Sequence, residues 1–156
     1  MCELTIREID QDEEFADWLG EVLHDESQAT ENAFSSEDHY LVLADEIGDW
    51  IGGLRYALRG GVAHLMELAI VPAQRHQGHA HRLLAAFEEH SRLSGGHLVE
   101  FWTRDLRSEA LLAAFGWRRV LERPRYIGHE TWYLLEKELE VVPDAQPDLE
   151  QIRVDP

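Results

Sequence analysis

The most informative stretch of this protein is residues 65–84, which read LMELAIVPAQRHQGHAHRLL. An apolar run ends at Pro72, a loop containing Gly78 follows, and Leu83 and Leu84 begin the apolar face of a helix. The stretch therefore predicts a strand, a short glycine loop and an amphipathic helix. Because the first amides of a helix lack internal partners and lie at the positive end of its dipole, the loop is predicted to bind an anion.

The charges of the same stretch favour a phosphate. No acidic residue occurs between Glu67 and Glu88, although 31 of the 156 residues are acidic. Small side chains at Gly78 and Ala80 would let a phosphate approach the backbone. The basic and titratable residues here are Arg75, His76, His79, His81 and Arg82. The alternative is an ordinary strand–loop–helix joint with surface His and Arg, and the loop is not a Walker loop because no Gly-Lys-Ser/Thr follows.

Length and charge bound the class of protein. The 156 residues are 44% hydrophobic and predict one domain over 1–140, followed by an acidic, proline-containing tail over 141–156. The formal charge of −17 argues against nucleic-acid binding. This charge is uneven, since residues 1–49 carry −15 and residues 136–156 carry −5, whereas residues 50–135 carry +3. The ends are acidic and the centre is mildly basic. Genomic base composition or a salty cytoplasm would explain the acidic ends but not the basic centre.

Neither a membrane nor an oxidising compartment is expected. The longest uncharged stretch is far shorter than the roughly 20 apolar residues that span a bilayer. The first residues show no secretory signal, and the single cysteine, Cys2, cannot form an internal disulfide. The protein is therefore predicted to be cytoplasmic, with no nucleic-acid or membrane partner, as a monomer or homodimer.

Periodicity predicts the remaining elements. In chain order these are a strand over 4–9, a helix with an apolar stripe from Phe15 to Leu23, a short helix or loop over 27–38, strands over 40–44, 50–58 and 62–71, a helix ending at Gly95-Gly96, a strand over 98–103, a helix over about 107–115 and a hairpin of 118–127 with 131–139. The order β-α-α-β-β-β-α-β-α-β-β predicts a mixed α/β (α+β) fold with one strand–helix–strand crossover in a mostly antiparallel sheet.

Two motifs carry a resemblance to a known family. The element Arg75-x-x-Gly78-x-Ala80 resembles the Arg/Gln-x-x-Gly-x-Gly/Ala acetyl-CoA signature of the GCN5-related N-acetyltransferase (GNAT) superfamily. The tripeptide Phe115-Gly116-Trp117 stands in for that family's frequent Leu-Gly-Phe. The resemblance implies a GNAT-like central sheet flanked by helices, in which the strands over 62–71 and 98–103 splay apart to admit a cofactor.

The resemblance also implies a reaction and a binding site. The cosubstrate would be acetyl-CoA, and the acceptor would be a primary amine of a small molecule or peptide. The backbone of Leu68, Ala69 and Ile70 would pair with the pantetheine, and Asp105 falls where the family often has a pantetheine-contacting asparagine. The pyrophosphate would lie on the loop formed by Arg75, His76, Gln77, Gly78, His79 and Ala80.

Direct attack on the thioester requires a neutral amine, so a general base is expected. Three candidates follow from the resemblance and from strand position: Glu67, Glu100 and His64, of which two could share a water relay. Each also has a structural interpretation, as an outward strand carboxylate or a hydrogen-bonded histidine. The tyrosine that commonly acts as general acid in the family falls at Leu112, which leaves Tyr126, Tyr133 or water as proton donor, unless no acid is needed or the enzyme is impaired.

Two other classes of function remain open. One is a catalytically silent acyl-CoA-binding sensor. The other is a metal-binding module built on His76-x-x-His79-x-His81, although no Cys or carboxylate lies nearby as a fourth ligand, so no metal is expected. For an enzyme, the acid-rich first helical region predicts a positively charged acceptor such as a polyamine, an aminoglycoside-like compound or a basic peptide terminus. These acids could also merely solvate an outer helix face.

Overall fold

A computed structural model describes residues 4–29 and 36–140, and the predicted tail over 141–156 lies outside them. The chain divides into two units, Met1–Ser35 and Ser36–Pro156, which are described separately. The helices and strands in chain order are α1 (Glu13–Ala29), β1 (Glu37–Ala44), β2 (Trp50–Arg59), β3 (Val62–Ile70), the 3-10 turn η1 (Pro72–Gln74), α2 (His79–Leu93), β4 (Leu98–Thr103), α3 (Leu106–Ala114), β5 (Arg118–Arg123), the turn η2 (Ile127–His129) and β6 (Trp132–Glu138). Among the described residues, no helix is long and apolar enough to cross a membrane.

In the first unit the structure describes helix α1 and residues 4–12, which precede it. Asp12 begins the helix as its cap, because its Oδ1 accepts a hydrogen bond of 2.9 Å from the amide of Glu14. The predicted helix is confirmed and extends to Ala29. The predicted strand over 4–9 is wrong: these residues form no strand, and Leu4 and Ile6 are almost fully exposed. Alternating side chains create a face for a strand, but a strand also needs a neighbouring strand to complete its hydrogen bonds.

The segment over 27–38 was predicted as one short helix or loop, and the structure divides it. Its first three residues continue α1, and residues 37 and 38 begin β1. Residues 30–35 between them lie outside the described residues. The apolar stripe that predicted the helix ends at Leu23. The helix continues beyond it because each further turn needs backbone hydrogen bonds and not apolar side chains.

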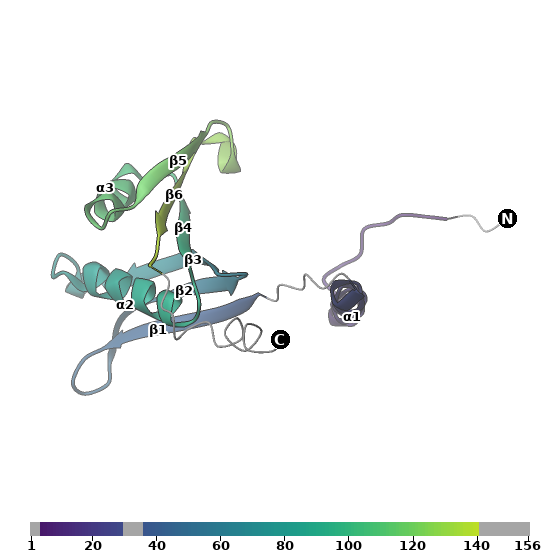
Figure 1. Ribbon diagram of the computed structural model, residues 1–156, viewed down its shortest axis with the longest axis horizontal. Helices are drawn as coiled ribbons and strands as arrows, with labels where there is room; N and C mark the ends of the chain where they lie inside the picture. The colour runs from purple at the N-terminus through teal and green to yellow at the C-terminus, as the bar shows by residue number, and fades with distance from the viewer. Residues whose placement is uncertain (1–3, 30–35, 141–156) are drawn as a thin grey trace, which may run out of the picture. The chain divides into compact units, whose positions relative to one another are not determined.

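The second unit is built on a six-stranded sheet in the order β1-β2-β3-β4-β6-β5 (Figure 1). The pairs are antiparallel except for β3 with β4, which are parallel and joined by the crossover helix α2. The predicted mixed, mostly antiparallel sheet flanked by helices is therefore confirmed. Its strands agree with the predicted ones to within a few residues at their ends.

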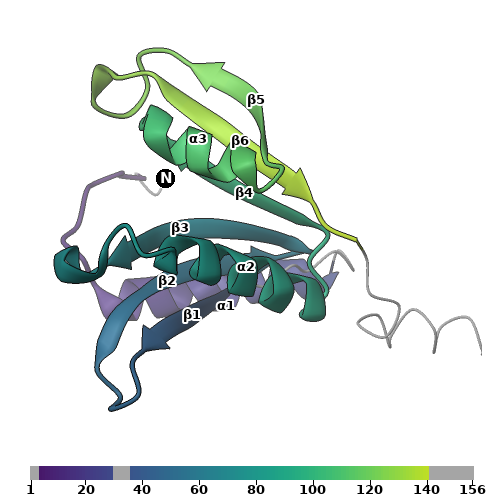
Figure 2. The ribbon, with the colours of Figure 1, turned by 90° about the vertical axis from the view of Figure 1, so that its left-hand side faces the viewer.

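Strands β3 and β4 separate soon after they meet. Only three residue pairs join them, Val62↔Leu98, Ala63↔Val99 and His64↔Glu100. Beyond His64 on β3 and Glu100 on β4, the two strands no longer pair with each other, and Figure 2 shows them diverging. This splay matches the expectation for the strands over 62–71 and 98–103, and it leaves unpaired backbone groups on the facing edges of both strands.

An irregularity in β3 changes the direction of its side chains. Leu65 pairs with Tyr56 and Glu67 pairs with Arg55, so Met66 is an extra residue in the ladder with β2. Residues three apart in a regular strand point to opposite faces, but the extra residue puts His64 and Glu67 on the same face. The bulge lies at Met66, two residues before the segment Leu68–Ile70 that the resemblance assigns to pantetheine binding.

The two helices of this unit cover one face of the sheet. Figure 2 shows α2 lying along β1–β3 and α3 along β4–β6. The core lies beneath them and consists of Leu54, Tyr56, Leu58, Ala63, Leu65, Leu83, Leu84, Phe87, Val99, Leu112, Trp117 and Leu135. The opposite face carries His64, Glu67 and Glu100, which alternate along their strands with these core residues.

Candidate active site

The loop between β3 and α2 adopts a backbone that favours anion binding. Gly78 has φ 81° and directly precedes the helix, and His76 also has a positive φ of 63°. Gly78 offers no side chain to cap the helix, and the first helical hydrogen bond runs from the amide of Arg82 to the carbonyl of Gly78 at 3.2 Å. The amides at the start of α2 are therefore left free for an external acceptor.

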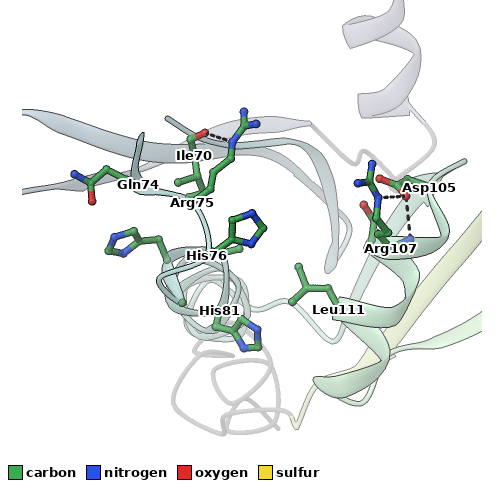
Figure 3. A pocket seen from close by; sticks show the side chains of 12 residues that line it. Ile70, Gln74, Arg75, His76, His81, Asp105, Arg107 and Leu111 are labelled. Atoms are coloured by element: carbon green, nitrogen blue, oxygen red, sulfur yellow. Dashed lines mark hydrogen bonds and ion pairs between the residues drawn. The ribbon is translucent and has the colours of Figure 1, made fainter. Parts of the chain in front are cut away.

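These amides border a cavity of about 670 Å³ between the loop and helix α3. Figure 3 shows Arg75, His76 and His81 on one side of it and Asp105, Arg107 and Leu111 on the other. Asp105 is the one acidic residue among the described residues that line it. Its full lining is Ile70, Gln74, Arg75, His76, Gly78, His79, Ala80, His81, Asp105, Arg107, Ser108 and Leu111.

The cavity brings together seven of the ten residues predicted to bind the cosubstrate, and three lie elsewhere. Leu68 packs against the core, Ala69 lines a second cavity on the opposite face, and Gln77 is exposed. Sequence reasoning missed five lining residues: Gln74, His81, Arg107, Ser108 and Leu111. Arg107, Ser108 and Leu111 lie on α3 at spacings of three and four residues, which places them on one face of the helix. Asking which face of the predicted helix turns toward the loop could have found them.

Two side chains of the cavity, Arg75 and His79, differ in their polar contacts. The Nε of Arg75 donates to the carbonyl of Ile70 at 3.1 Å, which folds the arginine back over the end of β3. Both ring nitrogens of His79 are shielded from water and make no hydrogen bond among the described residues. A buried polar group without a partner is costly, so this ring is not stabilised by hydrogen bonds within the described part of the protein.

Asp105 lines the cavity, but its carboxylate caps helix α3. Its Oδ1 accepts from the amide of Arg107 at 2.9 Å, and its own amide donates to Thr103 Oγ1 at 3.0 Å. The hydrogen bond from the Arg107 backbone lowers the pKa of the Asp105 carboxyl, with smaller help from the Arg107 side chain. The residue that stands at the family's asparagine position is therefore an anion engaged with its own helix.

Leu112, at the position of the family's usual tyrosine, is a core residue. Its side chain is only 2% exposed and it does not line the cavity, whereas Ser108 and Leu111 on the same helix do. The described cavity thus contains one aliphatic hydroxyl from α3, that of Ser108, and no phenol.

Two of the three base candidates meet where the strands separate. His64 and Glu100 are the last paired residues of β3 and β4, and His64 Nδ1 lies 2.9 Å from Glu100 Oε1. Their side chains are 30% and 27% exposed, so both are partly shielded but reachable. If Nδ1 donates this hydrogen bond, Nε2 of His64 carries a free lone pair, and it has no partner among the described residues.

Glu67 lies apart from this pair. Its side chain is 72% exposed and lies 3.5 Å from Arg55 Nη2 on the neighbouring strand β2. Both residues line the second cavity, of about 570 Å³, on the face of β1–β3 that α2 does not cover. Glu67 is therefore exposed to solvent beside a guanidinium, whereas the His64–Glu100 pair is partly shielded.

The histidines of the loop do not form a metal centre in the structure. Among residues 4–29 and 36–140, no group of three or more His, Cys, Asp or Glu side chains is placed to hold a metal ion. His81 instead packs against Phe115, with ring centroids 4.9 Å apart.

The fold and the cavity define a class of protein, an α/β domain in which a helix start with free amides borders a cavity beside two splayed strands. The family model "Acetyltransferase (GNAT) family" matches residues 4–117. The chain therefore belongs to the GNAT acetyltransferase family. A search of the curated proteins found no match.

Solved structures agree on the fold. A proposed acetyltransferase from Agrobacterium tumefaciens is similar over 88% of this chain and 100% of its own, with 20% identity and a TM-score of 0.72. An acetyltransferase from Bacillus cereus is similar over 86% of this chain and 98% of its own, with 17% identity and a TM-score of 0.68. An aminoglycoside 6'-N-acetyltransferase solved with coenzyme A is similar over 83% of this chain and 88% of its own, with 16% identity and a TM-score of 0.61.

Proposed function

We propose that this protein transfers an acetyl group from acetyl-CoA to a primary amine of a small molecule or peptide. Family membership supports acetyl-CoA as the cosubstrate, and a cavity lining with Asp105 as its one acid among the described residues supports phosphate binding beside the helix start. The free amides at the start of α2 and the side chains of Arg75 and His79 would hold the pyrophosphate. Asp105 lies in the same cavity, but its carboxylate accepts from the helix that it caps.

The observation that carries this proposal is the His64–Glu100 hydrogen bond at the point where the strands separate. A ligand that extends from the cavity between β3 and β4 reaches this point from one face, and an amine can approach from the other. We infer that His64 Nε2 takes the proton of the attacking amine. Glu100, bound to Nδ1, orients the imidazole and stabilises its charged form.

The chemistry balances without a further reactant. The amine nitrogen forms a bond to the acetyl carbonyl carbon, the carbon–sulfur bond breaks, and CoA leaves as a thiolate. The proton lost by the amine passes to His64, which releases it to solvent, and the thiolate takes up one proton from solvent, so no net proton is gained or lost. A thiolate is a fair leaving group, so the buried Leu112 at the tyrosine position does not prevent the reaction.

The surrounding charges support the pair. Glu136 on β6 faces Glu100 across the ladder, and two carboxylates in that relation repel each other. Arg118 Nη2 lies 2.7 Å from Glu136 Oε1 and compensates that charge. Glu100 is thus left with His64 as its hydrogen-bond partner.

The proposal is tested by steady-state kinetics and calorimetry on three variants. His64→Ala should lower kcat by about 100- to 10,000-fold, and Glu100→Gln should lower it less. Both variants should bind acetyl-CoA with nearly unchanged affinity. His90→Ala is a matched control, because His90 lies on the exposed last turn of α2.

Two outcomes would change the assignment. If Glu67→Gln loses activity while His64→Ala retains it, the base is Glu67. If the wild type fails to bind acetyl-CoA at millimolar concentration, the proposed function is wrong. Binding without acetylation of any amine would instead favour a silent acyl-CoA sensor.

A further inference from the structure

Three aromatic side chains form a cluster that the proposed mechanism does not use. The ring of Trp102 on β4 lies 5.3 Å from that of Tyr126, and Tyr126 lies 6.5 Å from Trp132 on β6, centroid to centroid. The second pair meets edge to face, at 88°. Trp102 and Trp132 are partly buried, and Tyr126 is 36% exposed, so the cluster keeps an open ring surface.

The cluster lies on the same face of the sheet as the proposed base. Trp102 is the second residue after Glu100 on β4, so their side chains point to the same face about 7 Å apart. Trp102 pairs with Leu134, which places Trp132 on this face as well. Figure 2 shows the β5–β6 connection, which contains Tyr126, at the end of the sheet where β3 and β4 have diverged.

The connection is held in place from both sides. Nε1 of Trp132 donates to the carbonyl of Ile127 at 2.9 Å, and the amide of Tyr126 donates to the carbonyl of Glu130 at 2.9 Å. Rings presented by an anchored loop form a binding surface that loses little conformational freedom when a ligand is bound.

Two arginines beside the aromatic cluster disfavour the binding of a ligand cation there. The guanidinium of Arg123 already lies 4.6 Å from the centroid of the Tyr126 ring, and Arg104 pairs with Glu130 of the same connection. A ligand ammonium at the cluster would meet these arginines, whereas an uncharged planar group would not. The cluster therefore suits an aromatic ring, which pairs with Trp and Tyr in offset or edge-to-face contacts.

We propose that the acceptor is an arylalkylamine, whose ring lies on Trp102 and Tyr126 while its amine reaches the His64–Glu100 pair. This inference rests on the proposed acetyl transfer. The separation of about 7 Å between Glu100 and Trp102 along the strand corresponds to two or three atoms between amine and ring. Such an amine carries a single positive charge in water, which also agrees with the negative formal charge of the chain.

The first test is a comparison of acceptors under identical conditions. We expect kcat/KM for 2-phenylethylamine to exceed that for n-butylamine and for spermidine by at least about 10-fold, since the ring contacts add to the burial of the apolar surface. Equal or higher values for spermidine or n-butylamine would overturn the arylalkylamine assignment while leaving acetyl transfer intact. If no amine is acetylated, the proposed function fails first.

The second test separates binding by the ring from a structural role of Trp102. In Trp102→Leu, the ratio of kcat/KM for 2-phenylethylamine to that for n-butylamine should fall about 5- to 10-fold, and Trp102→Phe should restore most of it. Trp50→Leu is the control, because Trp50 is an exposed tryptophan at the start of β2, and its ratio should equal that of the wild type. Saturation-transfer NMR with 2-phenylethylamine should show the same order of binding without turnover. A loss that is equal for both amines, with an unchanged ratio, would assign Trp102 to structure alone.

Discussion

A single glycine, Gly78, lies at the end of the cavity that we propose to hold the phosphates. A Cβ at Gly78 would meet no atom within 4 Å, so the space above this residue belongs to the cavity and not to packed protein. Its φ of 81° lies in the left-handed region that other residues adopt only with strain. The position therefore combines an open approach to the helix amides with a backbone that glycine adopts freely.

We predict that Gly78→Glu lowers the affinity for acetyl-CoA by at least about 100-fold, because juxtaposed like charges cost several kcal/mol. Isothermal calorimetry measures this directly. Gly48→Glu is a matched control, since Gly48 has φ 90° and also has no atom within 4 Å of its Cβ position, but it lies in the turn between β1 and β2. The control should show similar strain and normal binding, and normal binding by Gly78→Glu would place the phosphates elsewhere.

At the scale of elements, one glutamate connects helix α2 to the far part of the sheet. Glu88 Oε1 accepts from Trp117 Nε1 at 2.9 Å, and its Oε2 accepts from Lys137 Nζ on β6 at 3.2 Å. Lys137 Nζ also donates to the carbonyl of Phe115 at 2.8 Å, at the end of α3. Three elements thus share one hydrogen-bonded group, where the splay reduces direct pairing between β3 and β4.

We predict that Glu88→Ala lowers the free energy of unfolding by about 1–3 kcal/mol, because the partly buried indole and ammonium donors lose their acceptor. Glu88→Gln keeps an acceptor for Trp117 and should lose less. Glu89→Ala, at the exposed neighbouring position that pairs only with Arg92 among the described residues, should change stability by less than about 0.5 kcal/mol. Urea unfolding followed by tryptophan fluorescence would compare them, and equal stabilities for the two alanine variants would refute the connecting role.

For the whole molecule, the uneven charge predicts how a cationic acceptor arrives. The formal charge is −17, and the segment from Asp10 to Glu26 contains eight acids and no Lys or Arg. A negative surface raises the encounter rate with a cation, and salt screens this effect as the Debye length falls from about 30 Å at 0.01 M to about 8 Å at 0.15 M.

We therefore expect kcat/KM for a protonated arylalkylamine to fall several-fold between these ionic strengths. An amine that is uncharged at the assay pH, such as O-benzylhydroxylamine, provides the control and should be nearly insensitive. A protonated acceptor that is equally insensitive to salt would show that the acids only solvate the helix.

Local patterns in the sequence were sufficient for much of this protein. The strand, glycine loop and helix of residues 65–84 follow from neighbouring residues, because Pro72, Gly78 and the apolar spacing after it act within a few positions. For the same reason the loop residues of the cavity could be predicted, and seven of the ten residues predicted to contact the cosubstrate line one cavity. The strand over 4–9 failed because alternation describes one strand and does not supply its partner.

Contacts between residues distant in sequence depended on the folded chain. His64 and Glu100 are 36 positions apart, and both were proposed as bases separately, but only the three-residue pairing of β3 with β4 makes them one hydrogen-bonded group. The bulge at Met66 and the exposure of Glu67 likewise follow from the register with β2. Local signals in the sequence act through neighbouring residues. Strand register and splay depend instead on how the whole sheet packs, and the residue pattern of one strand does not contain that information.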